Sequence, residues 1–167
     1  MASRFPQRDA MSFVIRGLSP EPFRPLFALD AAALAARNIR RVVGDADRGF
    51  PCRVTLQDAQ QGETLLLLPY LHHDVAGPYR ASGPIYVREA ALHIHAAEYH
   101  DTLPPSFPRR LLSLRAYDED GLMRDAEVVE GANASPHLQR LLDAPGVAYL
   151  HVHNARPGCY ACRVDPG

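Results

Sequence analysis

The sequence predicts an α+β fold built mainly from antiparallel sheet, and three observations lead to this class. Segments with the alternating pattern of strands outnumber helical segments, and turns containing glycine or proline separate them. The helical segments lie near the N-terminus and in one short stretch before the C-terminal strands. Strands and helices do not alternate regularly, which argues against a parallel βαβ sheet.

The N-terminal region predicts one strand followed by two helices. We expect residues 1–10 to form a flexible extension and residues 11–167 to form a single α+β domain, which is long enough for its own core. Residues 11–17 predict the strand. Ser19 and Pro20 are typical of a helix start, because the hydroxyl caps free amides and proline fits the first turn. Asp30 is expected to cap an alanine-rich helix over residues 31–38.

The rest of the chain predicts strands and one short helix. The expected strands of the middle region cover residues 42–43, 53–56, 64–70 and 84–88. Residues 91–96 form either another strand or part of an irregular arm that ends at Pro104. The sequence Asp-Glu-Asp-Gly at 118–121 predicts a hairpin between strands 111–117 and 122–129. A short helix beginning at Ser135 precedes a final hairpin of strands 147–154 and 159–164.

Composition and charge exclude several classes of protein. The net charge of −1 does not suggest a surface for nucleic acid. The longest apolar run, 65–68, is far shorter than the roughly 20 residues that cross a membrane. No secretory signal is recognisable, and three cysteines do not form a disulfide framework, so we expect a cytoplasmic protein. Neither a phosphate-binding loop nor a dinucleotide fingerprint is present, and we expect no cofactor.

The C-terminal turn contains the densest chemistry. On a strand, Tyr149, His151 and His153 lie on one face, and Asn154 then enters the turn that leads to Cys159. A hairpin brings Cys159 within reach of these histidines, as a thiolate nucleophile with a histidine base requires. Two alternatives remain: Cys159 is a small buried side chain, or the turn binds a molecule without covalent chemistry.

Three arginines are the other candidates for a binding site. The sequence has 18 arginines and no lysine. The planar guanidinium group of arginine suits carboxylate and phosphate groups. Arg80 follows a turn, Arg88 ends a strand, and Arg115 lies among core-like neighbours. They either pair with carboxylates, for which the candidates are Asp118, Glu89 and Asp125, or converge on an anionic ligand. In the second case Tyr79, Ser82 and Asn154 complete the hydrogen bonding.

Two further patterns have simpler interpretations. A redox pair of Cys159 and Cys162 is disfavoured, because residues three apart on a strand face opposite sides. The stretch 93–100 contains three histidines and a glutamate, the residue types of a metal site, but a solvated loop between prolines explains them as well. We predict no metal site. The sequence His72-His73-Asp74 is interpreted as a loop or the rim of a pocket.

Four blocks of sequence resemble a bacterial family catalogued as domain of unknown function 1203. They are Gly-Phe-Pro-Cys-Arg-Val at 49–54, residues 78–89, residues 112–121, and Tyr-Leu-His-Val-His-Asn at 149–154 followed by Gly158-Cys159. The resemblance extends from about residue 11 to the C-terminus, with the blocks in the family's order. It implies no activity, because the family has none established.

The sequence therefore leads to a hypothesis and two alternatives. The hypothesis is a site for a small anionic or polar molecule, at the open end of the sheet, built from Arg80, Arg88, Arg115, His151, His153, Asn154 and Cys159. The first alternative is an enzyme with Cys159 as nucleophile and His153 as base. The second is a protein-interaction module without a pocket, which uses a sheet edge or the helix that carries Phe23 and Phe27. The oligomeric state is left open.

Overall fold

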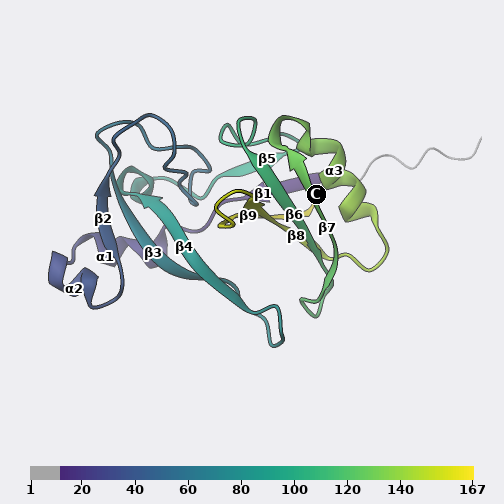
Figure 1. The fold of residues 1–167 in the computed structure, drawn as a ribbon, viewed down its shortest axis with the longest axis horizontal. Coiled ribbons are helices and arrows are strands. Elements are labelled where there is room, and N and C mark those ends of the chain that lie inside the picture. Colours follow the sequence, from purple (N-terminus) through teal and green to yellow (C-terminus); the bar gives the residue numbers. More distant parts are fainter. Residues whose placement is uncertain (1–11) are drawn as a thin grey trace, which may run out of the picture.

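The computed structural model describes residues 12–167, so the expected extension 1–10 lies outside the described residues. Two antiparallel sheets lie side by side (Figure 1). The larger sheet has the strand order β5 (Glu98–His100), β1 (Phe13–Arg16), β9 (Tyr160–Pro166), β8 (Tyr149–Asn154), β6 (Leu111–Tyr117) and β7 (Met123–Glu130). The smaller sheet consists of β2 (Arg40–Val43), β3 (Thr64–His73) and β4 (Ala81–Arg88).

The described helices are few and short. They are the α-helices α1 (Arg24–Phe27), α2 (Ala31–Ala35) and α3 (Ala134–Asp143), and the 3₁₀ turns η1 (Glu21–Phe23), η2 (Glu89–His93) and η3 (Gly131–Asn133). Mainly antiparallel sheets with few helices are consistent with an α+β or a mostly β class. None of the described helices is long and apolar enough to cross a membrane.

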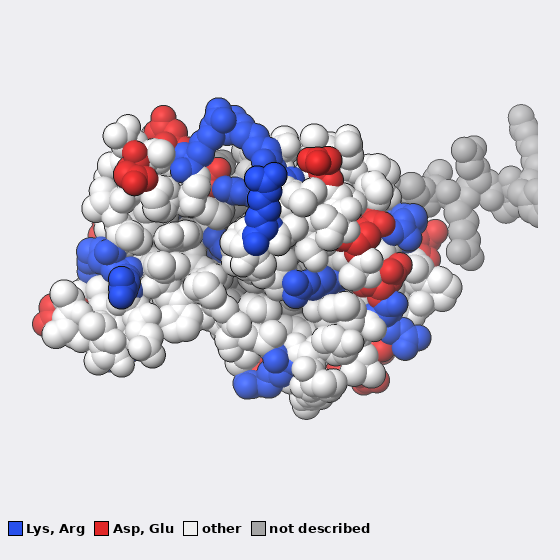
Figure 2. Space-filling view, viewed as in Figure 1, with Lys and Arg blue, Asp and Glu red and all other residues white. Residues whose placement is uncertain are grey.

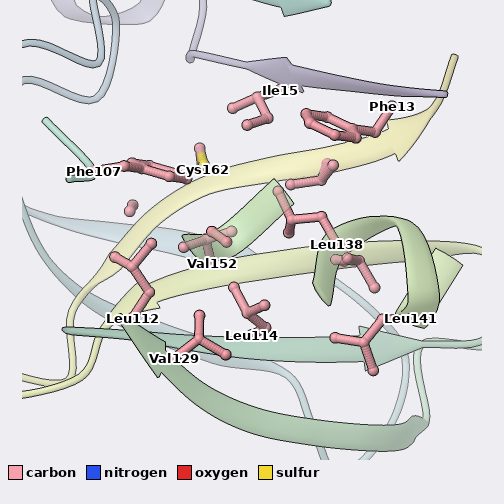
Figure 3. Packing of buried hydrophobic residues seen from close by; sticks show 14 of the residues in the cluster. Phe13, Ile15, Phe107, Leu112, Leu114, Val129, Leu138, Leu141, Val152 and Cys162 are labelled. Atoms are coloured by element: carbon pink, nitrogen blue, oxygen red, sulfur yellow. The ribbon is translucent and has the colours of Figure 1, made fainter. Parts of the chain in front are cut away.

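The larger sheet packs one face against α3. Figure 3 shows Leu138 and Leu141 of α3 in one cluster with Leu112 and Leu114 of β6 and Val152 of β8. Leu138 and Leu141 are three residues apart and lie on one side of the helix, where both are fully buried. Each such leucine stabilises the fold by about 1.5–3 kcal/mol through burial. This face of the sheet is therefore core and leaves the opposite face for a site.

A second core joins the N-terminal helices to the smaller sheet. Phe23, Phe27 and Leu34 pack there with Leu66 and Ile85. Phe23 is 2% exposed and Phe27 is 9% exposed. The smaller sheet covers these two side chains, so they are not available for the partner contact that the sequence suggested for this helix.

Both predicted hairpins are confirmed. The Asp118 carboxylate accepts hydrogen bonds from the amides of Asp120 at 3.0 Å and Leu122 at 2.9 Å, which closes the turn between β6 and β7. The second hairpin joins β8 to β9 through residues 155–159. Both turns are formed by residues that are adjacent in the sequence. The ends of the four strands match the expected ranges to within two residues.

The expected strand over residues 53–56 is wrong. Residues 53–55 form a turn, closed by the amide of Leu56, which donates to the Cys52 carbonyl at 2.9 Å. Leu56 adopts a positive φ of 55°, a conformation rare for such a side chain. Leu56 packs in the core against α3, whereas Val54 packs in the core of the smaller sheet. Apolar side chains of this segment point into two different cores, and the resulting alternation in the sequence resembles that of a strand.

Two other expectations need correction. The second helix ends at Ala35 rather than near residue 38, although the Asp30 carboxylate caps it by accepting from the Ala33 amide at 2.8 Å. Residues 91–96 are not a strand, because η2 covers 89–93 and irregular chain follows as far as β5. The arm interpretation was closer, except that residues 98–100 pair with β1.

The face of β8 opposite α3 carries polar side chains. Leu150 and Val152 belong to the core, whereas His151 pairs with Arg115 of β6, and His153 pairs with Ser113. Arg163 lies opposite His151 in the regular part of the pairing of β8 with β9, and a bulge between Val152 and His153 sets Tyr160 opposite His153. Bulges re-aim side chains in this way.

Candidate functional site

A pocket of about 540 Å³ opens at the turn between β8 and β9. Segments from both sheets line it: Gly49, Pro51, Arg53, Tyr86, Arg109, Arg110, Leu111, Glu130, Asn154, Arg156, Pro157 and Cys159. Figure 2 shows basic side chains gathered across the top of the molecule, between the regions of the two sheets. Four arginines and one glutamate give the lining a positive balance, which suits an anion.

Arg53 places a cation inside the fold. Its side chain is among the largest that are fully buried, and the whole residue is 2% exposed. Its Nε donates to the Tyr160 carbonyl at 2.7 Å, and Nη1 donates to the Pro51 carbonyl. It forms no ion pair among the described residues. Burial lowers the pKa of Arg53, with the nearby Cys159 sulfur opposing this shift, but guanidinium groups remain charged in proteins.

Cys159 and Asn154 form the wall of the pocket beside Arg53. The Asn154 amide Nδ2 donates to Cys159 Sγ at 3.4 Å. Cys159 is half-buried, whereas Cys52 and Cys162 are buried and all three are free thiols. Cys162 lies in the core against α3, so it lies away from the pocket that Cys159 lines.

The three arginines proposed from the sequence do not share this pocket. Arg80 is exposed and pairs with Asp74 at 2.9 Å in the turn after β3. Arg88 pairs with Glu63 at 2.7 Å. These carboxylates differ from the partners expected from the sequence, and they neutralise both cations. Arg115 lacks a carboxylate partner among the described residues, and its Nε donates to the Ser113 hydroxyl at 3.3 Å.

Tyr79 and Ser82 also lie outside the pocket. The Tyr79 carbonyl accepts a hydrogen bond from His73 Nδ1 at 2.7 Å, and the residue as a whole is 39% exposed. Ser82 is exposed on β4, where it lines a shallow depression with Asn38 and Arg40. Of the residues expected at the binding site, Asn154 and Cys159 are the two in the pocket at the β8–β9 turn.

Three histidines meet between the two sheets. His151 and His153 come from β8, and His72 comes from the end of β3. One nitrogen from each ring lies within 4.8 Å of the corresponding nitrogens of the other two. Tyr160 stacks on the His72 ring, with centroids 5.1 Å apart and planes at 5°. We call His72, His151 and His153 the histidine cluster.

Burial keeps the histidine cluster neutral. It lowers the pKa of His151 to about 2 and the pKa of His153 to about 4. The pKa of His72 is lowered too, first by burial and then by the neighbouring His73 and Arg115. Neutral imidazoles keep an electron pair on one ring nitrogen at physiological pH.

His73 lies beside the cluster but differs from it. Its Nδ1 donates to the Tyr79 carbonyl, and its Nε2 accepts from the Tyr149 hydroxyl, both at 2.7 Å. Both of its nitrogens are therefore engaged. The side chains of the stretch 93–100 do not form a metal-binding group within the described part of the chain.

Sequence reasoning missed several residues of these sites. Arg53 was hidden within a predicted strand, although an arginine between Cys52 and Val54 signals a buried cation. Arg109 and Arg156 lie next to prolines, Arg110 follows Arg109, and all three suggested only surface loops. The sequence indicated that His72 is a loop residue or part of a pocket rim; His72 does line a cavity, but nothing local shows that β3 continues to His73.

The fold and the site define a class: a protein of two antiparallel sheets with an arginine-lined pocket and a buried histidine cluster between them. The chain belongs to the family described as "Protein of unknown function (DUF1203)", whose model matches residues 49–165. This confirms the resemblance for the part of the chain that contains every residue of the pocket and of the cluster. No curated protein and no solved structure matches the chain.

Proposed function

We propose that this protein binds a small anionic molecule in the pocket at the β8–β9 turn. The observation that supports the proposal is the buried guanidinium of Arg53, which has no carboxylate partner in the described chain and lines this pocket. A buried cation without a counter-charge is costly, and an anionic ligand supplies that charge. Arg109, Arg110 and Arg156 add a basic rim.

The rim arginines differ in how free they are to bind. Arg110 pairs with Asp58 at 2.6 Å, so its charge is largely satisfied. Arg109 and Arg156 are exposed and form no ion pair among the described residues. We infer that these two close over the ligand, while Arg53 and the Asn154 amide fix it from below. Carboxylate and phosphate groups both fit such a set of donors.

The experiment is calorimetric titration of the full chain with two probes, inorganic phosphate and succinate. We expect saturable binding of one anion per chain, weakened by added salt because exposed charges contribute. Replacing Arg156→Gln removes a charge-assisted hydrogen bond of about 1.5 kcal/mol, which weakens binding roughly tenfold.

Arg37→Gln is the matched control, because Arg37 is exposed and lies outside the pocket lining. Its affinity for either probe should equal that of the unmodified protein. The proposal is wrong if neither anion binds saturably, or if the two variants behave alike.

The enzymatic alternative has weaker geometric support. Cys159 lies in the pocket beside Arg53, as a nucleophile would. However, His153 Nδ1 bonds the Gly158 carbonyl at 3.1 Å, and within the described chain neither nitrogen of His153 bonds the Cys159 thiol. The turn would have to rearrange before His153 could act as the base for the Cys159 thiol. Binding without covalent chemistry is therefore the simpler function.

The interaction-module alternative is also less well supported. The large exposed apolar residues of the described chain come from two strands and three separate connecting segments: Val43, Tyr79, Ile94, Leu122 and Val128. Scattered apolar residues are normal on a protein surface, whereas an interaction site requires a continuous patch.

A further inference from the structure

The geometry points to a binding site for one divalent transition-metal ion, such as Zn²⁺, held by His72, His151 and His153. This site is separate from the proposed anion pocket, because none of the three histidines lines that pocket.

The first argument is the state of the ring nitrogens. In the described part of the chain, the buried side-chain nitrogen or oxygen atoms without a hydrogen-bond partner are His72 Nδ1, His151 Nδ1 and His153 Nε2. Buried polar atoms without a partner are rare, because each costs about 1–3 kcal/mol. Here such atoms occur one on each ring of a single cluster, and a shared metal ion satisfies all three together.

The second argument is that the protein fixes the ligands as metal sites usually do. His153 Nδ1 bonds the Gly158 carbonyl at 3.1 Å, and a carbonyl only accepts, so Nδ1 carries the proton and Nε2 keeps its electron pair. Such a hydrogen bond sets the tautomer and orientation of a metal-binding histidine. His151 and His153 are held on a central strand, and Tyr160 stacks on His72.

Distances and donor type define the class of metal. Imidazole nitrogen suits zinc, copper, nickel and iron, whereas calcium and magnesium prefer oxygen. Tetrahedral zinc with bonds of about 2.0–2.1 Å places its nitrogen ligands about 3.3 Å apart. One nitrogen of each ring lies within 4.8 Å of those of the other two, so zinc binding requires side-chain rotations that shorten these distances to about 3.3 Å.

The surroundings predict the fourth ligand. The cluster contains no carboxylate, and the Arg115 guanidinium is close enough to lower the pKa of His72 and His153. A divalent ion there adds positive charge beside a cation, which favours an anion such as hydroxide in the fourth position. His72 and His151 border a cavity of about 350 Å³, which Arg163, its ion-pair partner Asp165 and Asp74 also line, and this cavity gives the fourth ligand access.

The test is metal binding by the full chain, first stripped of metal with a chelator and then dialysed against Zn²⁺ or Co²⁺ alone. We expect one ion per chain by elemental analysis, and X-ray absorption of the zinc-loaded protein that shows three imidazole nitrogens. The absorption measurement uses the unmodified protein, so it does not depend on whether a variant folds. Failure to retain an ion, or a zinc ion bound through sulfur, overturns the proposal.

Variants then assign the ligands. His72→Ala affects a half-buried ligand, and it should weaken zinc binding by more than about 100-fold, since loss of a supporting residue alone costs about 10–100-fold. His95→Ala, at an exposed histidine outside the cluster, should leave zinc binding unchanged. Equal affinity of the two variants contradicts the site. Arg156→Gln should retain zinc, so that loss of phosphate binding and loss of metal binding can be told apart.

Discussion

The two proposed sites depend on two kinds of side chain, arginine and histidine, and burial affects the charge of each kind differently. Arg53 keeps its charge inside the fold, because guanidinium does not lose its proton, and two backbone carbonyls accept its hydrogen bonds. The histidines of the cluster respond in the opposite way: burial lowers their pKa and keeps them neutral. Burial therefore leaves a charged guanidinium beside the proposed anion pocket and neutral ring nitrogens at the separate, proposed metal site.

Neutral histidines make the metal-free protein sensitive to acid. The pKa of His151 falls from 6.5 to about 2 and that of His153 falls to about 4, so below pH 6.5 the unfolded chain binds protons that the folded chain does not. Their contribution to stability is therefore fully present above pH 6.5 and is lost as the pH falls from there toward 4. In that range, each of the two histidines lowers the free energy of unfolding by about 1.4 kcal/mol for every pH unit of acidification.

Urea unfolding of the chelator-treated protein between pH 8 and pH 5 measures this effect. The free energy of unfolding should be nearly constant above pH 7 and should fall steeply below pH 6.5. His153→Asn should flatten the decline, whereas His95→Ala, at an exposed site, should not. A stability that stays constant down to pH 5 would show that the cluster is not kept neutral.

Among the elements, the C-terminal hairpin organises both sites. Its strand β8 carries the buried histidines on one face and core residues on the other, and its turn carries Asn154 and Cys159 into the pocket. The bulge opposite His153 turns Tyr160 toward the histidine cluster and leaves Cys162 in the core. One hairpin therefore separates a pocket thiol from a core thiol three residues away.

This separation predicts which thiols react. In the folded protein, a neutral water-soluble disulfide reagent should modify Cys159, whereas Cys52 and Cys162 are 1% exposed and should react only after unfolding. Burial also raises the pKa of the Cys162 thiol, which keeps it protonated. Mass spectrometry of the labelled protein identifies the sites. Modification of Cys162 as fast as Cys159 would contradict the arrangement of the hairpin.

The same elements show which features a sequence reveals. The hairpins at 118–121 and 155–158 are predictable, because turn residues and alternation are local. The shared face of His151 and His153 follows from alternation on one strand. The turn at 53–56 is not predictable, since its residues are divided between two cores, and β5 exists only through pairing with β1.

At the scale of the whole molecule, both sites lie where the two sheets meet. The pocket takes its lining from residues 49–53 and Tyr86 on the side of the smaller sheet, and from residues 109–111 and 154–159 on the side of the larger one. The histidine cluster joins β3 to β8 in the same way. No short motif could disclose either site, because each depends on segments far apart in the sequence.

Binding at this junction should connect the two sheets, and nuclear magnetic resonance tests this most directly. Titration of isotope-labelled protein with inorganic phosphate should shift the Arg53 Nε–H signal. Amide signals from residues 49–53, 109–111 and 154–159 should shift with it, along one saturable binding curve. Shifts confined to the exposed Arg109 and Arg156, without saturation and with an unchanged Arg53 signal, would show that the anion only meets the surface and would contradict the proposed function.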